Sequence, residues 1–222
     1  MKISVFFCQL IILFSPLVEL SQSQKCLMKP PYLEMEIPVK GFIWLENEEF
    51  EGTCDEITET GWTKYPGKEF NLYIQAEGPE GRGRYWNVSI GFSTIPDTIP
   101  ERGFCFVTST VGWRTLRNFD QIPLKWASDE DADGKPELVI WDSFPLSEEP
   151  TMVEFGLMAW VYQVDGNGKC KIDWNLSRKK AFEIAASYQK PLEKNNPTLT
   201  KLRKTAFKAL VDFASGKCNP GN

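Results

Sequence analysis

The spacing of hydrophobic residues changes once along this 222-residue chain. Before about residue 175 they form short runs rich in aromatic and β-branched residues, and runs such as Phe70–Ile74 alternate apolar with polar side chains. Alternation of this kind is typical of β-strands. From Leu176 onward apolar residues recur every three to four positions, as on one face of a helix. Strands first and helices last predict an α+β fold, mainly an antiparallel sheet followed by two C-terminal amphipathic helices.

The same patterns give approximate boundaries. The Pro-rich stretch 28–38 is expected to be irregular, and two runs flanking the turn residues 78–83 predict a β-hairpin. Strands are expected at residues 39–45, 70–74, 85–92, 103–110, 124–126, 138–144, 153–164 and 170–174. The first helix is expected to be capped by Asn175 or Ser177 and ended by Pro191, and the second to start at Pro197 and stop at Gly216.

An apolar run from Ile3 to Val18 follows Met1-Lys2 at the start of the chain. It is shorter than the roughly 20 residues that a membrane-spanning helix needs, and Ser21 and Ser23 are small residues before a cleavage point. We therefore expect a signal peptide at residues 1–23 and a secreted or periplasmic mature chain. An uncleaved N-terminal anchor is the alternative. No membrane span is expected in the mature form.

The length of residues 24–222 is typical of one domain, so we expect a single β-rich domain with a helical segment at about 176–215. The net charge is −5, and the isoelectric point is near 5.0. Nucleic-acid-binding proteins concentrate Lys and Arg on one face. The composition therefore argues against a nucleic-acid partner.

Cysteines bear on both the compartment and the fold. Five of the six lie beyond the expected signal peptide, and they are Cys26, Cys54, Cys105, Cys170 and Cys218. No C-x-x-C pair occurs, which argues against zinc and thioredoxin-like chemistry. In an oxidising compartment they can form two disulfides at most, and the sequence leaves the pairing open. We favour Cys170 with Cys218, which would tie the last helix to the sheet.

Acidic residues alternate between Asp129 and Glu137, in the sequence DEDADGKPE. Counted from Asp129, side-chain oxygens fall at positions 1, 3, 5 and 9, from Asp129, Asp131, Asp133 and Glu137, and Gly134 is at position 6. Calcium needs six to eight oxygen ligands, and glycine permits the tight bend that brings them together. The stretch therefore predicts a calcium site. An acidic surface turn is the alternative, because Asp and Gly also favour turns.

The loop is not an EF-hand, because position 12 is Ile140 rather than Glu and the flanking runs predict strands rather than helices. It resembles the calcium loop of integrin-type FG-GAP and VCBS repeats, which lies inside a β-hairpin. The resemblance implies five ligands, the side chains of Asp129, Asp131, Asp133 and Glu137 and the carbonyl of Lys135. Those families carry such loops in tandem propeller blades, whereas this chain has one, so neither the propeller nor an adhesive role is implied.

The sequence contains no histidine. This excludes Ser-His-Asp triads, Cys-His pairs and His-ligated zinc, and leaves a carboxylate pair of the glycosidase kind. Glu154, between Val153 and Phe155, is the best isolated candidate for a carboxyl with a perturbed pKa. An outward-facing strand residue is the alternative.

A second acidic turn, Asp165-Gly166-Asn167-Gly168 with Asp173 downstream, has one carboxylate in the turn itself. We interpret it as a hairpin rather than a metal site.

Two surface features bear on partners. The eight tryptophans are mostly expected in the core, with at most two on a surface that binds a glycan or a protein. The polar face of the second helix carries Lys201, Arg203, Lys204 and Lys208, which we interpret as a solvated face rather than a membrane surface.

The sequence thus predicts a non-enzymatic extracytoplasmic domain in which calcium rigidifies a hairpin, with a glycan or protein as possible ligand. The alternative is a small secreted, glycosidase-like hydrolase that uses carboxylates and holds calcium structurally.

Overall fold

The computed structural model describes residues 26–37, 44–45, 63–77, 85–94, 102–109, 124–147, 149–151, 154–190 and 197–220. Sheet A has the strand order β1 (Glu34–Glu36), β10 (Lys169–Ile172), β9 (Phe155–Val164), β8 (Glu137–Pro145) and β7 (Ala127–Ser128). Sheet B has the order β2 (Trp44–Leu45), β6 (Arg102–Ser109), β5 (Tyr85–Ser93), β4 (Asn71–Glu77) and β3 (Thr63–Pro66). The helices α2 (Trp174–Tyr188) and α3 (Pro197–Ala214) follow the strands in the chain.

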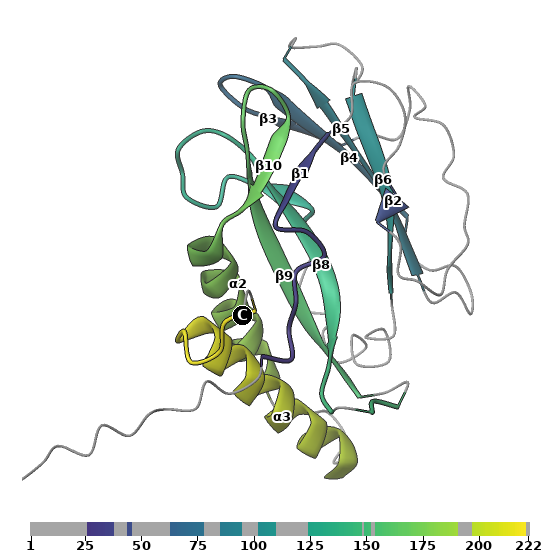
Figure 1. Ribbon diagram of the computed structural model, residues 1–222, viewed down its shortest axis with the longest axis vertical. Helices are drawn as coiled ribbons and strands as arrows, with labels where there is room; N and C mark the ends of the chain where they lie inside the picture. Colours follow the sequence, from purple (N-terminus) through teal and green to yellow (C-terminus); the bar gives the residue numbers. More distant parts are fainter. Residues whose placement is uncertain are drawn as a thin grey trace, which may run out of the picture.

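The predicted α+β class is confirmed. All described strand pairs are antiparallel except β2 with β6, which is parallel. The long strands β8 and β9 lie between the helices, at the lower left of Figure 1, and sheet B, at its right. Buried residues of both sheets and both helices form one hydrophobic cluster.

Strand β9 is buried on both faces over most of its length. This fits a strand with other layers on either side, because successive side chains of a strand point to opposite faces. Trp160, 1 % exposed, packs edge-on against Phe213 of α3 with ring centroids 5.6 Å apart. In sheet B the pairs Leu72–Phe92 and Ile74–Ile90 are cross-strand neighbours and buried, so one face of this sheet joins the core.

Helix α2 lies along the edge of β9 that β10 leaves uncovered. The Ser177 hydroxyl accepts a hydrogen bond from the Val161 N–H at 2.9 Å, and the Tyr188 hydroxyl accepts one from the Leu157 N–H at 2.9 Å. The Asp173 N–H donates to the Val161 carbonyl at 2.8 Å. The helix therefore satisfies backbone groups that an exposed strand edge would offer to another chain.

The first helix starts earlier than the sequence suggested. Its N-cap is Asp173, whose carboxylate accepts hydrogen bonds from the N–H groups of Asn175 at 2.8 Å and Leu176 at 2.9 Å. The expected caps, Asn175 and Ser177, were wrong because Trp174 continued the apolar run of the preceding strand. The second helix begins at Pro197 and stops before Gly216, whose φ is +75°, as predicted.

The interpretation of Arg203 as part of a solvated basic face was also wrong. Arg203 is 5 % exposed, and its guanidinium donates to the carbonyls of Ser187 and Lys190 at 2.9 and 2.8 Å and of Tyr188 at 3.2 Å. It thus satisfies carbonyls at the C-terminal end of α2. Lys201, Lys204 and Lys208 are exposed, as expected.

Two strand boundaries also differ. Residues 34–36, expected to be irregular, pair with β10 as strand β1, because Pro30 and Pro31 precede the paired segment rather than interrupt it. The strand expected at 124–126 is displaced to β7, whose Ala127 and Ser128 pair with Leu138 and Glu137. The hairpin of β4 and β5 is confirmed, with its tip outside the described residues.

The favoured Cys170–Cys218 pairing was wrong. Cys218, just after α3, pairs with Cys26, and Cys170 is a free thiol inside sheet A, 1 % exposed. The N-terminal segment runs beside the helices before it enters β1, so Cys26 reaches Cys218 across 192 positions of sequence (Figure 1). The disulfide therefore joins the two ends of the described chain.

In the part of the chain that the structure describes, no helix combines the length and apolar character needed to cross a bilayer. The expected signal peptide lies outside the described residues.

Candidate metal centre

The acidic loop connects β7 to β8 in the hairpin of sheet A. Asp129 follows the last residue of β7, and Glu137 is the first residue of β8. The loop is thus held at both ends by strand pairing, as the resemblance to FG-GAP and VCBS loops implied.

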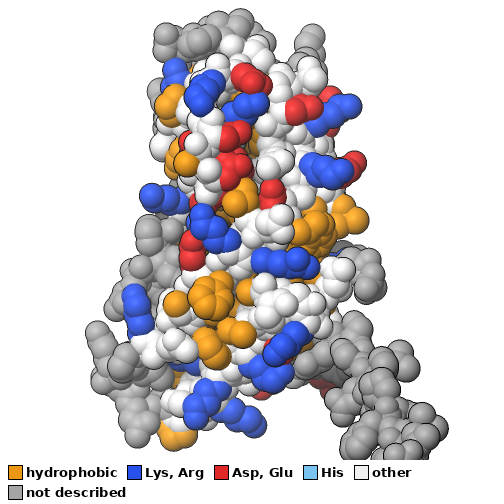
Figure 2. All heavy atoms as spheres, turned by 90° about the vertical axis from the view of Figure 1, so that its left-hand side faces the viewer, with side chains coloured by type: hydrophobic (Ala, Val, Ile, Leu, Met, Phe, Trp, Pro, Cys, Tyr) orange, Lys and Arg blue, Asp and Glu red, His pale blue; other side chains and the backbone are white. Residues whose placement is uncertain are grey.

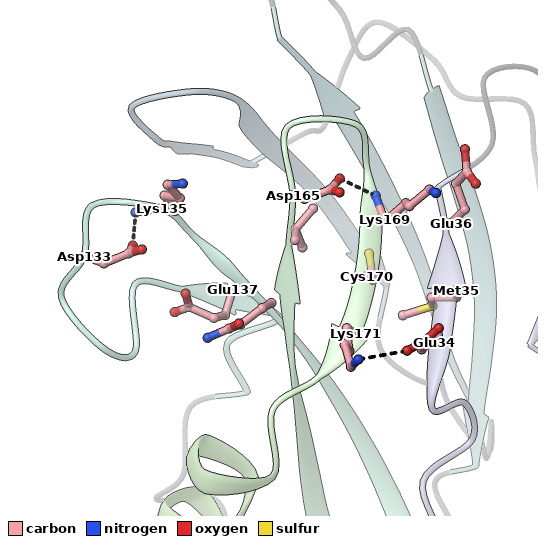
Figure 3. Close-up of a pocket in the computed structure, with 12 residues that line it drawn as sticks. Glu34, Met35, Glu36, Asp133, Lys135, Glu137, Asp165, Lys169, Cys170 and Lys171 are labelled. Carbon is pink, nitrogen blue, oxygen red and sulfur yellow. Dashed lines mark hydrogen bonds and ion pairs between the residues drawn. The ribbon is translucent and has the colours of Figure 1, made fainter.

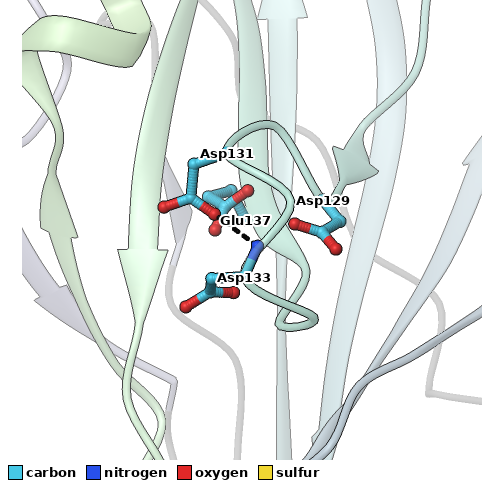
Figure 4. Close-up of side chains that lie close together, drawn as sticks. All are labelled: Asp129, Asp131, Asp133 and Glu137. Atoms are coloured by element: carbon cyan, nitrogen blue, oxygen red, sulfur yellow. Dashed lines mark hydrogen bonds between the residues drawn. The ribbon is translucent and has the colours of Figure 1, made fainter.

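The structure brings the four acidic side chains of the predicted ligand set together. One carboxylate oxygen from each of Asp129, Asp131, Asp133 and Glu137 lies within 4.8 Å of the other three, and Figure 4 shows these side chains around the turn of the loop. The three aspartates are exposed, whereas Glu137 is 3 % exposed. Glu137 is thus the buried member of the cluster.

Backbone hydrogen bonds to the aspartates fix the shape of the loop. The Asp133 N–H donates to Asp131 at 3.1 Å, the Lys135 N–H to Asp133 at 2.7 Å, and the Gly134 N–H to Asp129 at 3.0 Å. Ala132 and Gly134 have positive φ angles of 62° and 89°. Glycine adopts such angles without the steric cost that a Cβ adds, which explains its place at position 6.

The Glu137 carboxyl has a strongly raised pKa. Burial is the main cause that raises its pKa to about 7, and the negative charges of Asp131, Asp129 and Asp133 add to it. A hydrogen bond from the Glu130 N–H to Glu137 Oε2, at 2.6 Å, acts in the opposite direction. The folded chain thus concentrates negative charge at a buried carboxyl that is costly to ionise without a cation.

The donor set fits a hard divalent cation. Oxygens on opposite sides of a calcium ion are about 4.6–5.2 Å apart, twice the usual bond length, so separations within 4.8 Å suit one shared ion. Among the described residues, no Lys or Arg forms an ion pair with any of these four carboxylates. The Lys135 carbonyl is not part of the carboxylate cluster and stays a predicted ligand.

The turn between β3 and β4 packs against one side of the loop. Lys68 Nζ donates to the Asp133 carbonyl at 2.5 Å, and the Lys68 N–H donates to the Gly134 carbonyl at 3.1 Å. Lys135 Nζ pairs with Glu69 at 2.7 Å. A Cβ on Gly67 would lie 2.6 Å from Pro136 Cδ, so the turn and the loop are in close contact.

Helix α2 holds the other side of the loop through Glu130. The Glu130 carboxylate pairs with Lys180 Nζ at 2.6 Å and accepts a hydrogen bond from the Ser128 hydroxyl, and Lys179 Nζ donates to the Glu130 carbonyl at 2.9 Å. Burial raises the pKa of Glu130, but the hydrogen bonds from Lys180 and Ser128 and the nearby positive charges outweigh it, so the pKa lies below its usual value. Glu130 therefore stays ionised between the loop and the helix.

A pocket of about 720 Å³ adjoins the acidic cluster. Asp133 and Glu137 line it from the loop, and Glu34, Lys169 and Lys171 line it from β1 and β10 (Figure 3). Viewed from this side, the molecule shows acidic side chains gathered above the middle of the face, interspersed with Lys and Arg (Figure 2). The pocket therefore carries charged side chains on both walls, with apolar side chains such as Met35 and Val164 between them.

The second acidic turn forms the hairpin between β9 and β10, as interpreted from the sequence. Asp165 accepts hydrogen bonds from the N–H groups of Asn167 at 2.8 Å and Lys169 at 2.9 Å. Asp173 caps α2 instead of joining the turn. Within the described ranges, the cluster at Asp129 is the only group of three or more acidic or cysteine side chains placed to share a metal.

Glu154 lies immediately before β9, is half-buried, and accepts a hydrogen bond from the Thr151 N–H at 3.0 Å. It closes a turn, and it does not line the pocket beside the loop.

The tryptophans with described side chains are in the core or against it. Trp126, Trp141 and Trp160 are at most 4 % exposed, and the half-buried Trp174 packs edge-on against Trp160 at 6.3 Å. Trp44, Trp62, Trp86 and Trp113 have no described side chains. The most exposed large hydrophobic residue described is Phe182 on α2, at 62 %, which the sequence analysis did not single out.

Sequence reasoning also missed Glu130, Lys68 and Lys180, which hold the loop from outside the ligand set. Only Glu130 lies in the motif, at a position that the calcium template leaves unassigned, and no local pattern marks the two lysines.

Comparison with protein-family models, with curated proteins and with solved structures gives no match for this chain. The likeness to FG-GAP and VCBS repeats therefore concerns the loop alone, and the function has to be inferred from the geometry above.

Proposed function

We propose that this protein is an extracytoplasmic, non-enzymatic domain that binds calcium at Asp129, Asp131, Asp133 and Glu137, with the Lys135 carbonyl as a fifth ligand. The ion rigidifies the β7–β8 hairpin and stabilises the fold. The pocket beside the loop is the place for a glycan or protein ligand, because two of the metal ligands line it.

The observation that carries this proposal is the convergence of four carboxylates, one of them buried, none of which forms an ion pair with a described Lys or Arg. Negative charge at this density costs folding free energy unless a cation compensates it. Calcium accepts six to eight oxygen ligands in flexible geometry, whereas magnesium demands near-ideal octahedral geometry and usually keeps several waters, so a loop that offers four carboxylates favours calcium. The expected signal peptide and the disulfide Cys26–Cys218 support an oxidising compartment.

The experiment is thermal unfolding of the purified protein with calcium and with chelator. Calcium at about 100 times its dissociation constant should stabilise the native state by about 2.7 kcal/mol, which corresponds to about 5–11 °C in the unfolding midpoint of a domain this size. In Asp131→Ala this shift should vanish.

The matched control is Asp165→Ala, which removes an aspartate from the other acidic turn. Its midpoint will fall because two turn hydrogen bonds are lost, but the shift caused by calcium should match that of the wild type. An unchanged midpoint in wild-type protein with and without chelator would contradict the proposal.

A second candidate is the carboxylate-dependent hydrolase. The observation in its favour is that Glu137, with a pKa of about 7, lines the pocket together with Asp133. A general acid needs such a raised pKa, but calcium on the same carboxylate would remove its proton. Polysaccharide hydrolysis that increases with chelator and is lost in Glu137→Gln would favour this candidate over a binding domain.

A further inference from the structure

Glu130 joins two parts of the molecule that are far apart in sequence. Its N–H donates to Glu137 Oε2 at 2.6 Å, and its carboxylate pairs with Lys180 Nζ at 2.6 Å, 50 positions later in the chain. One residue therefore contacts both a proposed metal ligand and helix α2.

Both sides of the ion pair are well shielded from solvent. The side chains of Glu130 and Lys180 are 12 % and 17 % exposed, whereas most other ion pairs described involve side chains that are half exposed or more. Lys179 adds a bond to the Glu130 carbonyl at 2.9 Å. A shielded, hydrogen-bonded pair holds its partners in one geometry far better than a solvent-exposed one does.

We propose that Glu130, clamped by Lys180 and Lys179, is a positioning residue that holds Glu137 ready for calcium, so that metal binding and the packing of α2 on the loop strengthen each other. This inference rests on the proposed calcium function. Calcium affinity is then set partly by a helix that supplies no ligand. Conversely, calcium should tighten the contact of α2 with the loop, because coupling between two sites is reciprocal.

The direction in which removal of the Lys180 charge changes calcium affinity distinguishes a positioning role of Lys180 from a simple charge effect. Lys180 is a cation near the site, so its removal should tighten calcium binding if only Coulomb repulsion mattered. If Lys180 acts through Glu130, its removal should weaken binding. Substitution of Glu130 itself would be a poorer test, because loss of its negative charge weakens calcium binding whether Glu130 acts by positioning Glu137 or only through its charge.

The experiment is calorimetric titration of calcium into wild type, Lys180→Met, Lys180→Arg and Lys171→Met. Methionine keeps the aliphatic stem of lysine without its charge. We expect the dissociation constant to rise about five-fold or more in Lys180→Met, and to stay near the wild-type value in Lys180→Arg, because arginine can still pair with Glu130.

Lys171→Met is the matched control. Lys171 lines the same pocket, but its ion pair is with Glu34 on β1 and not with the loop. Its removal should leave calcium binding unchanged or slightly tighter. Equal or tighter binding in Lys180→Met would overturn the positioning role while leaving the calcium site intact, whereas a wild type that binds no calcium would overturn both.

A second measurement needs no variant. Hydrogen exchange of the wild-type protein should show added protection on calcium addition at the amides of the Lys179–Lys180 turn of α2, with β5 as an internal reference. Protection confined to the loop would contradict the coupling, even if Lys180→Met failed to fold.

Discussion

Lys68 Nζ donates a hydrogen bond to the carbonyl oxygen of Asp133 at 2.5 Å, across 65 positions of sequence. The contact joins the β3–β4 turn of sheet B to the acidic loop of sheet A. Together with the Lys135–Glu69 ion pair, it places the proposed metal site at a junction between the two sheets. A calcium ion there would stabilise more than its own hairpin.

The Gly134→Ala substitution tests this junction. A Cβ at position 134 would overlap the Lys68 side chain, and the φ of +89° is strained for any residue with a Cβ. We expect a loss of stability of about 1–2 kcal/mol from the backbone alone, plus weaker calcium binding as Lys68 is displaced. Urea unfolding and calcium titration measure the two effects.

The Gly216→Ala substitution is the control that distinguishes the effect of backbone strain from the effect of the clash with Lys68. Gly216 also has a positive φ, +75°, but a Cβ there would meet nothing within 4 Å. It should lose stability without any change in calcium affinity. If Gly134→Ala binds calcium as tightly as Gly216→Ala does, the Lys68 contact has no bearing on the metal site.

The pH dependence of calcium binding follows from the raised pKa of Glu137, about 7. Below that pH calcium must displace a proton, so the dissociation constant should fall by up to about ten-fold per unit as pH rises toward 7, and then level off. Calorimetric titrations on either side of neutrality measure this. Affinity that does not change across neutrality would mean that Glu137 is not a ligand.

The metal-free protein should respond to pH in the opposite direction. The folded-state pKa of Glu137 lies above its ordinary value of 4.5, so the folded state binds more protons than the unfolded state between these values. Stability in chelator should therefore decline as pH rises through this window. Burial of Asp142, which raises its pKa to about 6, acts in the same direction. Glu137→Gln should abolish the decline between about pH 6 and 7 and reduce it at lower pH, where Asp142 also contributes.

The sequence predicted the acidic loop well because the information is local. Asp129, Asp131, Asp133 and Glu137 are close in the chain, and their spacing together with Gly134 determines how their side chains converge. The surroundings of the loop were not predictable in this way. Lys68 and Lys180 approach it from elements 65 and 50 positions away, and neither differs locally from an ordinary surface lysine.

Errors in the fold have similar causes. Arg203 falls on the polar side of its helix by periodicity, yet the end of α2 lies against that side and buries it. The Cys26–Cys218 disulfide depends on where the N-terminal segment runs across the finished fold, which no pattern around either cysteine reveals. The α+β class was predictable, because the change of hydrophobic spacing is itself a property of consecutive residues.

Replacing Cys26 by Ser should destabilise the protein strongly. The disulfide closes a loop of 192 positions, and removal of a native disulfide typically costs about 2–5 kcal/mol. Chemical unfolding of Cys26→Ser against wild type measures the loss. Peptide mapping without reductant should recover Cys26 linked to Cys218, and a peptide linking Cys170 to Cys218 would contradict the structure.

The Arg203→Ala substitution should weaken the contact between α3 and the C-terminal end of α2. The guanidinium donates to the carbonyls of Ser187, Tyr188 and Lys190, so truncation removes three hydrogen bonds from a charged group to the C-terminal end of α2. Hydrogen bonds from charged groups contribute about 1.5–3 kcal/mol each to stability, but water can replace part of the lost bonding near the exposed Lys190. We therefore expect a total loss of about 2–4 kcal/mol in urea unfolding, less than the sum of three such bonds. Lys204→Ala, an exposed neighbour on the same helix, should change stability by less than about 0.5 kcal/mol. Because Tyr188 also bonds the edge of β9, Arg203→Ala should additionally speed hydrogen exchange at Leu157, which loss of the charge alone would not do.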